Sequence, residues 1–325
     1  MKKLSALLLL ALPAVAAVTG TVVNRTTGLP LAGATVVLNS LGQNGVEPVG
    51  ETRSDAQGRF VFDRELPGPG MIRASFGGVA FFRMLEPGAP TAGLALEVYA
   101  SSKQPGDVKV SKHMLFFEPS PAGQMAIQDT YIFTNPGKTV WNDPGRGELH
   151  FYLPAAAGGK VQVNATAPGG MPIPAELAAT SEADIKAVDF AIKPGETRFD
   201  VTYTVPYTPG EPYEGKVVTR DENTYLIAPR GVTLSGAGLT DLGPEPRTQA
   251  HLFGLDGATY RIALMVEEQP DNGPPIEVIP PRIYGSVVPI LGLALAALSV
   301  GFARLYRRSP VQQAPSKEAN ERGRG

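Results

Sequence analysis

Three histidines, His113, His150 and His251, are the side chains in this chain of 325 residues best suited to metal binding or acid–base chemistry. His113 is followed by Met114, and an imidazole next to a thioether sulfur suits copper. The two lie in a run with strand character, where adjacent side chains point to opposite faces. The pair cannot converge on one ion unaided, so we expect no metal site and no cofactor.

Nucleophilic chemistry is poorly supported by the residue patterns. The chain has no cysteine, which excludes a thiol nucleophile, a thiolate metal site and a disulfide. A Ser/His/Asp triad is formally possible, but no Gly-x-Ser-x-Gly elbow is present. Residues 235–238, Ser-Gly-Ala-Gly, lack the Lys-Ser/Thr pair of a phosphate-binding loop and are predicted to form a turn. We therefore predict no catalytic residue, and a protein that is not an enzyme.

Aromatic and carboxylate side chains offer weaker candidates. Trp141, Tyr207 and Tyr213 lie in predicted loops and could form a platform for sugar rings, although packing in the core or in turns is favoured. Asp55 lies in Ser-Asp-Ala-Gln-Gly, which lacks the alternating acidic residues of a calcium loop and favours an Asx turn. Asn24 and Asn164 begin glycosylation sequons, which matter only in a host that glycosylates.

Composition favours an all-β protein. The chain has 37 glycines and 31 prolines and few long apolar helical patterns, which indicates short strands joined by turns. The formal charge of −2 gives no electrostatic footprint for nucleic acid. The part between the two chain ends is long enough for two domains of ordinary size.

Residues 18–102 alternate with period two. Predicted strands at 19–23, 34–38, 59–62, 71–76, 79–84 and 94–99 are separated by turn signals, which is typical of a β-sandwich. The motifs in this stretch read Gly20-x-Val22, then Thr27-Gly28-x-Pro30-Leu31-Ala32-Gly33-Ala34-x-Val36-x-Leu38, then Ser54-Asp55-x-x-Gly58-x-Phe60-x-Phe62.

With these motifs, residues 18–102 resemble the carboxypeptidase regulatory-like domain. The resemblance covers about a quarter of the chain and implies a Greek-key, transthyretin-like sandwich, related in fold to starch-binding-like domains. It implies no peptidase activity, since the chain has three histidines and no His-x-x-Glu pairing. In this stretch Gly58 is expected to supply a positive φ before the strand that carries Phe60.

Residues 106–268 are predicted to form a second, immunoglobulin-like sandwich, and no family is evident for them. Predicted strands lie at 108–117, 126–135, 148–153, 161–165, 187–192, 197–205, 216–220, 224–228, 249–254 and 259–266. The clearest is 197–205, where Phe199, Val201 and Tyr203 alternate with polar residues, as in a strand with one buried and one solvated face. The length leaves open whether this part is one module or two.

The two ends of the chain predict export and a membrane anchor. Residues 1–17 have two lysines, a short apolar run and small residues suited to cleavage, as in a signal peptide. Residues 269–282 form a proline-rich stalk. Residues 283–303 are charge-free and, at about 1.5 Å per residue, roughly 31 Å long as a helix, enough to span a bilayer.

Residues 304–325 form a basic tail that is expected to stay in the cytoplasm, because positive residues flank a span on its inner side. The sequence thus predicts a single-pass cell-membrane protein whose body lies in the periplasm or the extracellular space. For its function we expect non-catalytic binding or scaffolding in the cell envelope, with a protein or glycan partner. The alternatives are a carbohydrate-binding surface protein and an accessory subunit of a membrane complex.

Overall fold

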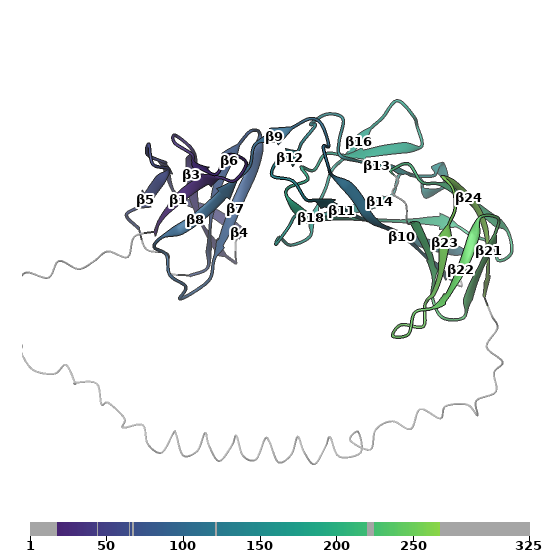
Figure 1. Ribbon diagram of the computed structural model, residues 1–325. Helices are drawn as coiled ribbons and strands as arrows, with labels where there is room; N and C mark the ends of the chain where they lie inside the picture. The colour runs from purple at the N-terminus through teal and green to yellow at the C-terminus, as the bar shows by residue number, and fades with distance from the viewer. Residues whose placement is uncertain are drawn as a thin grey trace, which may run out of the picture. The chain divides into compact units, whose positions relative to one another are not determined.

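The computed structural model describes residues 18–266, apart from residues 44, 65, 67, 121 and 220–223 (Figure 1). Within these described residues, no helix has the length and apolar character needed to cross a membrane. The predicted signal peptide, stalk, transmembrane helix and tail lie outside the described residues. The described part is all-β, as the sequence predicts, and apart from one 3₁₀ turn at Ala155–Ala157 (η1) its regular elements are strands.

Two four-stranded sheets form the first sandwich, which is purple to blue in Figure 1. In one sheet, β1 (Val18–Asn24) pairs antiparallel with β2 (Leu29–Pro30) and β5 (Arg59–Phe62), and parallel with β8 (Leu94–Val98). The other sheet has the order β4 (Gly45–Arg53), β3 (Thr35–Gly42), β6 (Gly70–Phe76) and β7 (Val79–Leu85). The alternating apolar side chains of both sheets meet in one core, which includes Val22, Val36, Leu38, Phe60, Ile72 and Leu96.

At two motif positions in this sandwich, sterics explain why the residue is glycine. Gly20 lies at the centre of β1, and a Cβ there would overlap the carbonyl oxygen of Leu94 and the ring of Phe60. Gly58 has a φ of +73°, which confirms the positive φ expected before β5. Both glycines let the backbone approach its neighbours where a side chain would not fit.

The second sandwich is built on an eight-stranded sheet. Its order is β15 (Ile173–Pro174), β14 (Val161–Thr166), β18 (Gly195–Pro206), β11 (Gln124–Asn135), β10 (Lys109–Ser120), β20 (Thr224–Ala228), β23 (His251–Leu255) and β22 (Leu239–Pro244). One three-stranded sheet has the order β13 (Leu149–Tyr152), β17 (Ile185–Val188) and β16 (Leu177–Ala179), and another has β19 (Pro212–Lys216), β24 (Thr259–Val266) and β21 (Val232–Gly236). A two-stranded sheet pairs β9 (Ser101–Ser102) with β12 (Val140–Trp141).

One continuous core lies between the eight-stranded sheet and the two three-stranded sheets. It extends along the chain from Val110 to Leu264 and includes Phe117, Phe151 and Phe199. Phe117 of β10 packs against Tyr260 of β24, with ring centroids 6.1 Å apart, which places the β19–β24–β21 sheet on the inner face of the large sheet. The residues predicted as one module or two therefore share a single hydrophobic core.

The strand order agrees with an immunoglobulin domain in one sheet only. The sequence β10–β11–β18–β14 matches the A-B-E-D order of a constant-type sheet, with every pair antiparallel. In the facing sheet, β13 pairs with β17, and β17 pairs with β16. These three strands precede β18 in the chain, whereas strands F and G of an immunoglobulin domain follow strand E. The facing sheet is therefore built differently from that of the predicted fold.

Candidate functional site

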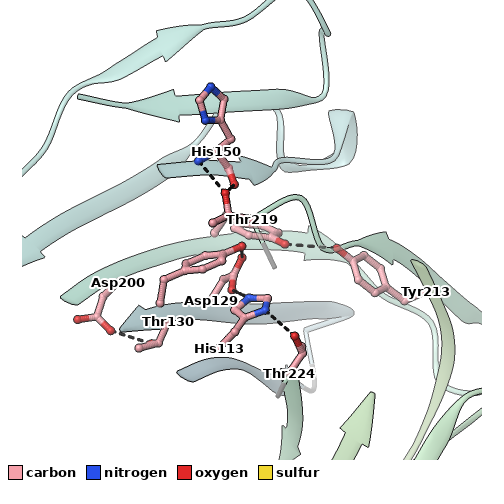
Figure 2. Close-up of polar contacts among 10 residues, drawn as sticks. His113, Asp129, Thr130, His150, Asp200, Tyr213, Thr219 and Thr224 are labelled. Atoms are coloured by element: carbon pink, nitrogen blue, oxygen red, sulfur yellow. Dashed lines mark hydrogen bonds and ion pairs between the residues drawn. The ribbon is translucent and has the colours of Figure 1, made fainter. Parts of the chain in front are cut away.

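His113 lies on the inner face of β10, fully buried, with both ring nitrogens hydrogen-bonded (Figure 2). Its Nε2 is 2.6 Å from Oδ1 of Asp129, and its Nδ1 is 3.1 Å from Oγ1 of Thr224. A carboxylate oxygen accepts hydrogen bonds, so Nε2–H is assigned as the donor to Asp129. The ring also stacks on Tyr131, with centroids 4.1 Å apart.

Asp129 is the centre of this buried polar network. Its second carboxylate oxygen accepts a hydrogen bond of 2.8 Å from the Tyr131 hydroxyl, so both oxygens have partners. A buried carboxylate is costly to desolvate, and its hydrogen bonds must offset that cost. The register of the eight-stranded sheet places these groups together, because His113 is paired with Tyr131 on one side and with Thr224 on the other.

This geometry bears on the copper hypothesis for His113 and Met114. His113 faces the core, and Met114, on the opposite face of β10, is partly exposed. With both ring nitrogens in hydrogen bonds, His113 has no free lone pair for an ion. Within the described residues there is also no group of three or more His, Cys, Asp or Glu side chains arranged to hold a metal.

The Thr224–His113–Asp129 arrangement has the residue types of a hydroxyl, base and acid triad. This group is not evident from the sequence, because the three residues meet only through strand register. A nucleophile must be reached by a substrate, and the Thr224 residue is 3% exposed. The arrangement therefore has the geometry of a structural polar network in the core of the sandwich.

A group of tyrosines extends from this network across the core. The Tyr203 and Tyr213 hydroxyls are 3.5 Å apart, and the Tyr213 and Tyr260 rings have centroids 6.2 Å apart. Burial raises the pKa of Tyr203, Tyr213 and Tyr260 above the ordinary value of about 10, because the phenolate would lose its hydration. Burial also raises the pKa of Tyr131, and the nearby Asp129 charge adds to that shift.

The other two histidines lie apart from His113. The backbone of His150 is held by Thr219, whose hydroxyl donates to the His150 carbonyl at 2.7 Å (Figure 2). Partial burial lowers the pKa of His150, and the positive charge of Arg146 adds to this. His251 lies near the β22 edge of the large sheet, with Nε2 at 2.6 Å from Oδ1 of Asp241. The structure therefore does not bring the three histidines together.

The aromatic residues considered for sugar binding have packing roles. Tyr207 is buried, and its hydroxyl donates to the Leu264 carbonyl at 2.6 Å. Tyr213 packs edge-on against Phe117, with centroids 6.0 Å apart. Trp141 is partly buried, and its ring is tilted against that of Phe133 at 6.4 Å. These three rings do not form a common exposed platform.

Other residues chosen from the sequence lie in local structure. Asp55 accepts hydrogen bonds from the backbone N–H groups of Gln57 and Arg59 at 2.9 and 2.8 Å, as expected of an Asx turn. Asn24 is buried, and its side-chain oxygen accepts from Thr26 N–H at 3.0 Å, so this sequon is not presented to solvent. Ser235 is in strand β21, and the predicted turn begins only after Gly236.

Glu148 is a buried carboxylate that sequence reasoning did not single out. Its two oxygens accept from the backbone N–H groups of Asp143 and Phe190, at 2.6 and 2.8 Å. Burial raises the pKa of Glu148 above its usual value. Through these bonds the side chain ties the 143–148 loop to the end of β17, which is a structural role.

A polar groove of about 460 Å³ opens beside β19 and β24. Its lining includes Tyr152, Asp184, Glu214, Lys216 and Arg261. The Lys216 ammonium lies 2.9 Å from Oδ2 of Asp184 and 5.6 Å from the centre of the Tyr152 ring. The Arg261 guanidinium lies 3.4 Å from Oε1 of Glu214. The charges are therefore paired within the groove, whose size suits a small ligand.

Comparison with known families agrees with the fold of the first sandwich. Residues 17–102 match the family model of the carboxypeptidase regulatory-like domain, which confirms the resemblance carried by the Gly20, Gly58 and Phe60 motifs. The match covers about a quarter of the chain. A search of curated proteins finds no match to this chain.

Proposed function

We propose that this protein is a membrane-anchored, non-catalytic binding or scaffolding protein of the cell envelope. The proposal combines the two chain ends with the all-β body. An export signal at 1–17, a span at 283–303 and a basic tail would place the body outside the cytoplasm. Sandwich loops and edges suit protein contacts, because a rigid scaffold positions them. One form of this role is an accessory subunit of a membrane complex.

The observation that supports the non-catalytic part is the burial of the triad-like group. His113 is fully buried, and Asp129 and Thr224 are each 3% exposed. A nucleophile and its general base must be reached by a substrate, which this burial prevents. The group is better suited to fixing the register of β10, β11 and β20 than to turnover.

The same proposal includes a fold for each of the two parts of the body. We propose a Greek-key, transthyretin-like sandwich at 18–102 and an immunoglobulin-like body at 106–268, which retains only one of the two immunoglobulin sheets. The stalk at 269–282, the transmembrane helix at 283–303 and the cytoplasmic tail at 304–325 complete the arrangement. The body would then lie in the periplasm or the extracellular space.

Membrane fractionation tests the anchor. The full chain is expected to sediment with membranes, to resist washing with high salt and with alkaline carbonate, and to be released by detergent. A matched variant that ends at residue 282 should be soluble and exported. Release of the full chain by salt alone would overturn the anchored role, because an apolar span leaves the bilayer only when lipid is replaced.

Carbohydrate binding is the second candidate, favoured by the groove beside β19 and β24. Its lining combines the Tyr152 ring, which has the Lys216 ammonium over one face, with the carboxylates of Asp184 and Glu214, and sugars bind to such combinations of an aromatic face and hydrogen-bonding groups. A glycan array probed with the detergent-solubilised full chain tests this. Binding that is lost in Tyr152→Ala and kept in Trp141→Ala would support the groove, and absence of binding to every glycan would reject it.

A further inference from the structure

The outer face of the eight-stranded sheet divides into a polar half and an apolar half. On β14, β18 and β11 most outward side chains are polar, among them Gln128, Asp200, Thr202 and Thr204, while Ala126 and Ile132 of β11 also face outward. Asp200 accepts from Thr130 at 2.8 Å and pairs with Arg198 at 2.7 Å, so its charge is balanced by neighbours on the same face.

The apolar half lies on β10, β20, β23 and β22. We call it the apolar half-face; it consists of Met114, Phe116, Tyr225, Ile227, Leu242 and Leu252. Strand register joins them in rows, since Met114 pairs with Tyr225 and Phe116 with Ile227, which pairs with Leu252. Leu242 is 52% exposed. The other five side chains are partly exposed, and an apolar patch on a face whose other half is mostly polar is a candidate surface for another molecule to cover.

The charged residues on either side of Met114 and Phe116 on β10 indicate what covers the apolar half-face. The outward side chains along this strand are Lys112, Met114, Phe116 and Glu118, so a cation and an anion flank two apolar residues. Both charged residues are exposed, and neither has an ion pair within the described part of the chain. When β10 of a second copy runs in the opposite direction, its Glu118 faces Lys112 and its Lys112 faces Glu118, so the strand is complementary to itself.

We infer that the apolar half-face is the interface for a second copy of this chain, related by a two-fold axis that lies between the two sheets and crosses β10 at Leu115. The axis places Lys112 of one copy opposite Glu118 of the other, and Met114 opposite Phe116. An isologous interface of this kind requires a self-complementary surface. This inference rests on the described residues and does not depend on the membrane anchor.

The shape of the half-face agrees with the same axis. Gly254 faces outward in the row of Tyr225, and a Cβ there would lie 3.8 Å from both Cδ1 of Leu242 and Cβ of Thr240. The axis brings Leu252 of the second copy over Gly254. A projecting leucine thus faces a residue without a side chain, while Tyr225 meets Ile227 of the second copy.

The area predicts a weak dimer. The half-face spans four strands about 4.8 Å apart and, along each strand, the seven residues from Lys112 to Glu118 at about 3.3 Å per residue. These dimensions give an area of roughly 400 Å² per copy. Stable complexes bury about 800 Å² per partner. Association should therefore be concentration-dependent, and cross-linking detects it better than chromatography.

Cysteine cross-linking tests the inference sharply, because the chain has no cysteine of its own. Full-length Lys112→Cys and Glu118→Cys variants with different tags are co-expressed, solubilised in detergent and treated with a bis-maleimide that spans about 10 Å, the usual spacing of packed sheets. The mixed Lys112→Cys/Glu118→Cys product is expected. Each variant alone should give little product, because its two cysteines would lie roughly 20 Å apart along the strands.

Thr204→Cys, on the polar half of the same face, is the matched control and should remain monomeric. Charge reversal supplies a second readout by native mass spectrometry. Lys112→Glu or Glu118→Lys alone should weaken the dimer about tenfold, and the double reversal in one chain should restore it. The inference is overturned if the mixed product is absent or if Lys112→Cys cross-links efficiently to a second Lys112→Cys chain. It is also overturned if Thr204→Cys cross-links equally well, or if the variants cross-link only to a different protein.

Discussion

Asp129 illustrates how a single buried residue determines local stability here. It lies between His113 and Tyr131, and each of its carboxylate oxygens accepts one hydrogen bond, at 2.6 and 2.8 Å. Because Tyr131 also stacks on His113, the three side chains form one unit in the centre of the sheet. Removing the carboxylate leaves two buried donors without an acceptor, which costs more than the bond itself contributes.

We predict that Asp129→Ala lowers the free energy of unfolding by about 3 kcal/mol, measured by denaturant titration of the full chain. The matched control is Glu214→Ala, which removes the exposed carboxylate of the Glu214–Arg261 pair and should cost less than about 1 kcal/mol. Equal losses in the two variants would contradict a stabilising role for the buried network.

The tyrosine cluster predicts a loss of stability in alkali. Burial raises the folded-state pKa of Tyr203, Tyr213 and Tyr260 above the unfolded value of about 10. Their contribution is therefore complete below pH about 10 and is lost as the pH rises above it, because the unfolded chain then releases protons that the folded chain retains. Phenolate absorbance should rise in two stages, exposed tyrosines first and the cluster together with unfolding. A single stage with the fold intact would contradict this.

Residue identities alone could not have located this site. The sequence singled out His113 and correctly predicted that it would not converge with Met114, since strand alternation is a local rule. Its partners Asp129 and Thr224 are 16 and 111 residues away in sequence, and only the pairing of β10 with β11 and β20 brings them together. Long-range register is a property of the whole sheet, which cannot be read from local residue patterns.

At the scale of the elements, β1 depends on a glycine at its centre. Gly20→Ala would force a methyl group against the Leu94 carbonyl and the Phe60 ring, and we expect a loss of about 2 kcal/mol or more in denaturant titration. Gly42→Ala is the matched control, because an added Cβ there would meet no atom within 4 Å and the φ of Gly42 is not positive. If Gly20→Ala lowers the free energy of unfolding no more than Gly42→Ala does, then β1 and β8 can move apart without loss of stability.

Strands with two distinct faces were predictable, and two largely exposed edge strands were not. The predicted strands at 59–62, 224–228 and 259–266 agree with β5, β20 and β24, because in each of them buried residues alternate with more exposed ones. β4 (Gly45–Arg53) and β22 (Leu239–Pro244) were missed. Both lie at sheet edges, contain proline or charged residues and are largely exposed, so neither has the apolar alternation that indicates a strand.

At the scale of the whole molecule, the sequence predicted the class but not the architecture of the second part. Its strands suggested an immunoglobulin-like sandwich, and β10, β11, β18 and β14 have that order. The parallel pairing of β10 with β20 then adds β20, β23 and β22, so the sheet reaches eight strands. Periodicity identifies strands but not their neighbours, which is why this extension was not predicted.

The central claim is that the body lies outside the cytoplasm and the tail inside, and labelling of single cysteines tests it most directly. Thr204→Cys in the body and Ala314→Cys in the predicted tail are placed separately in the cysteine-free full chain. A membrane-impermeant maleimide is then added to intact spheroplasts and to lysed ones. We predict that the body cysteine is labelled in both samples and the tail cysteine only after lysis. A body cysteine protected until lysis, or a tail cysteine labelled before it, would contradict the account.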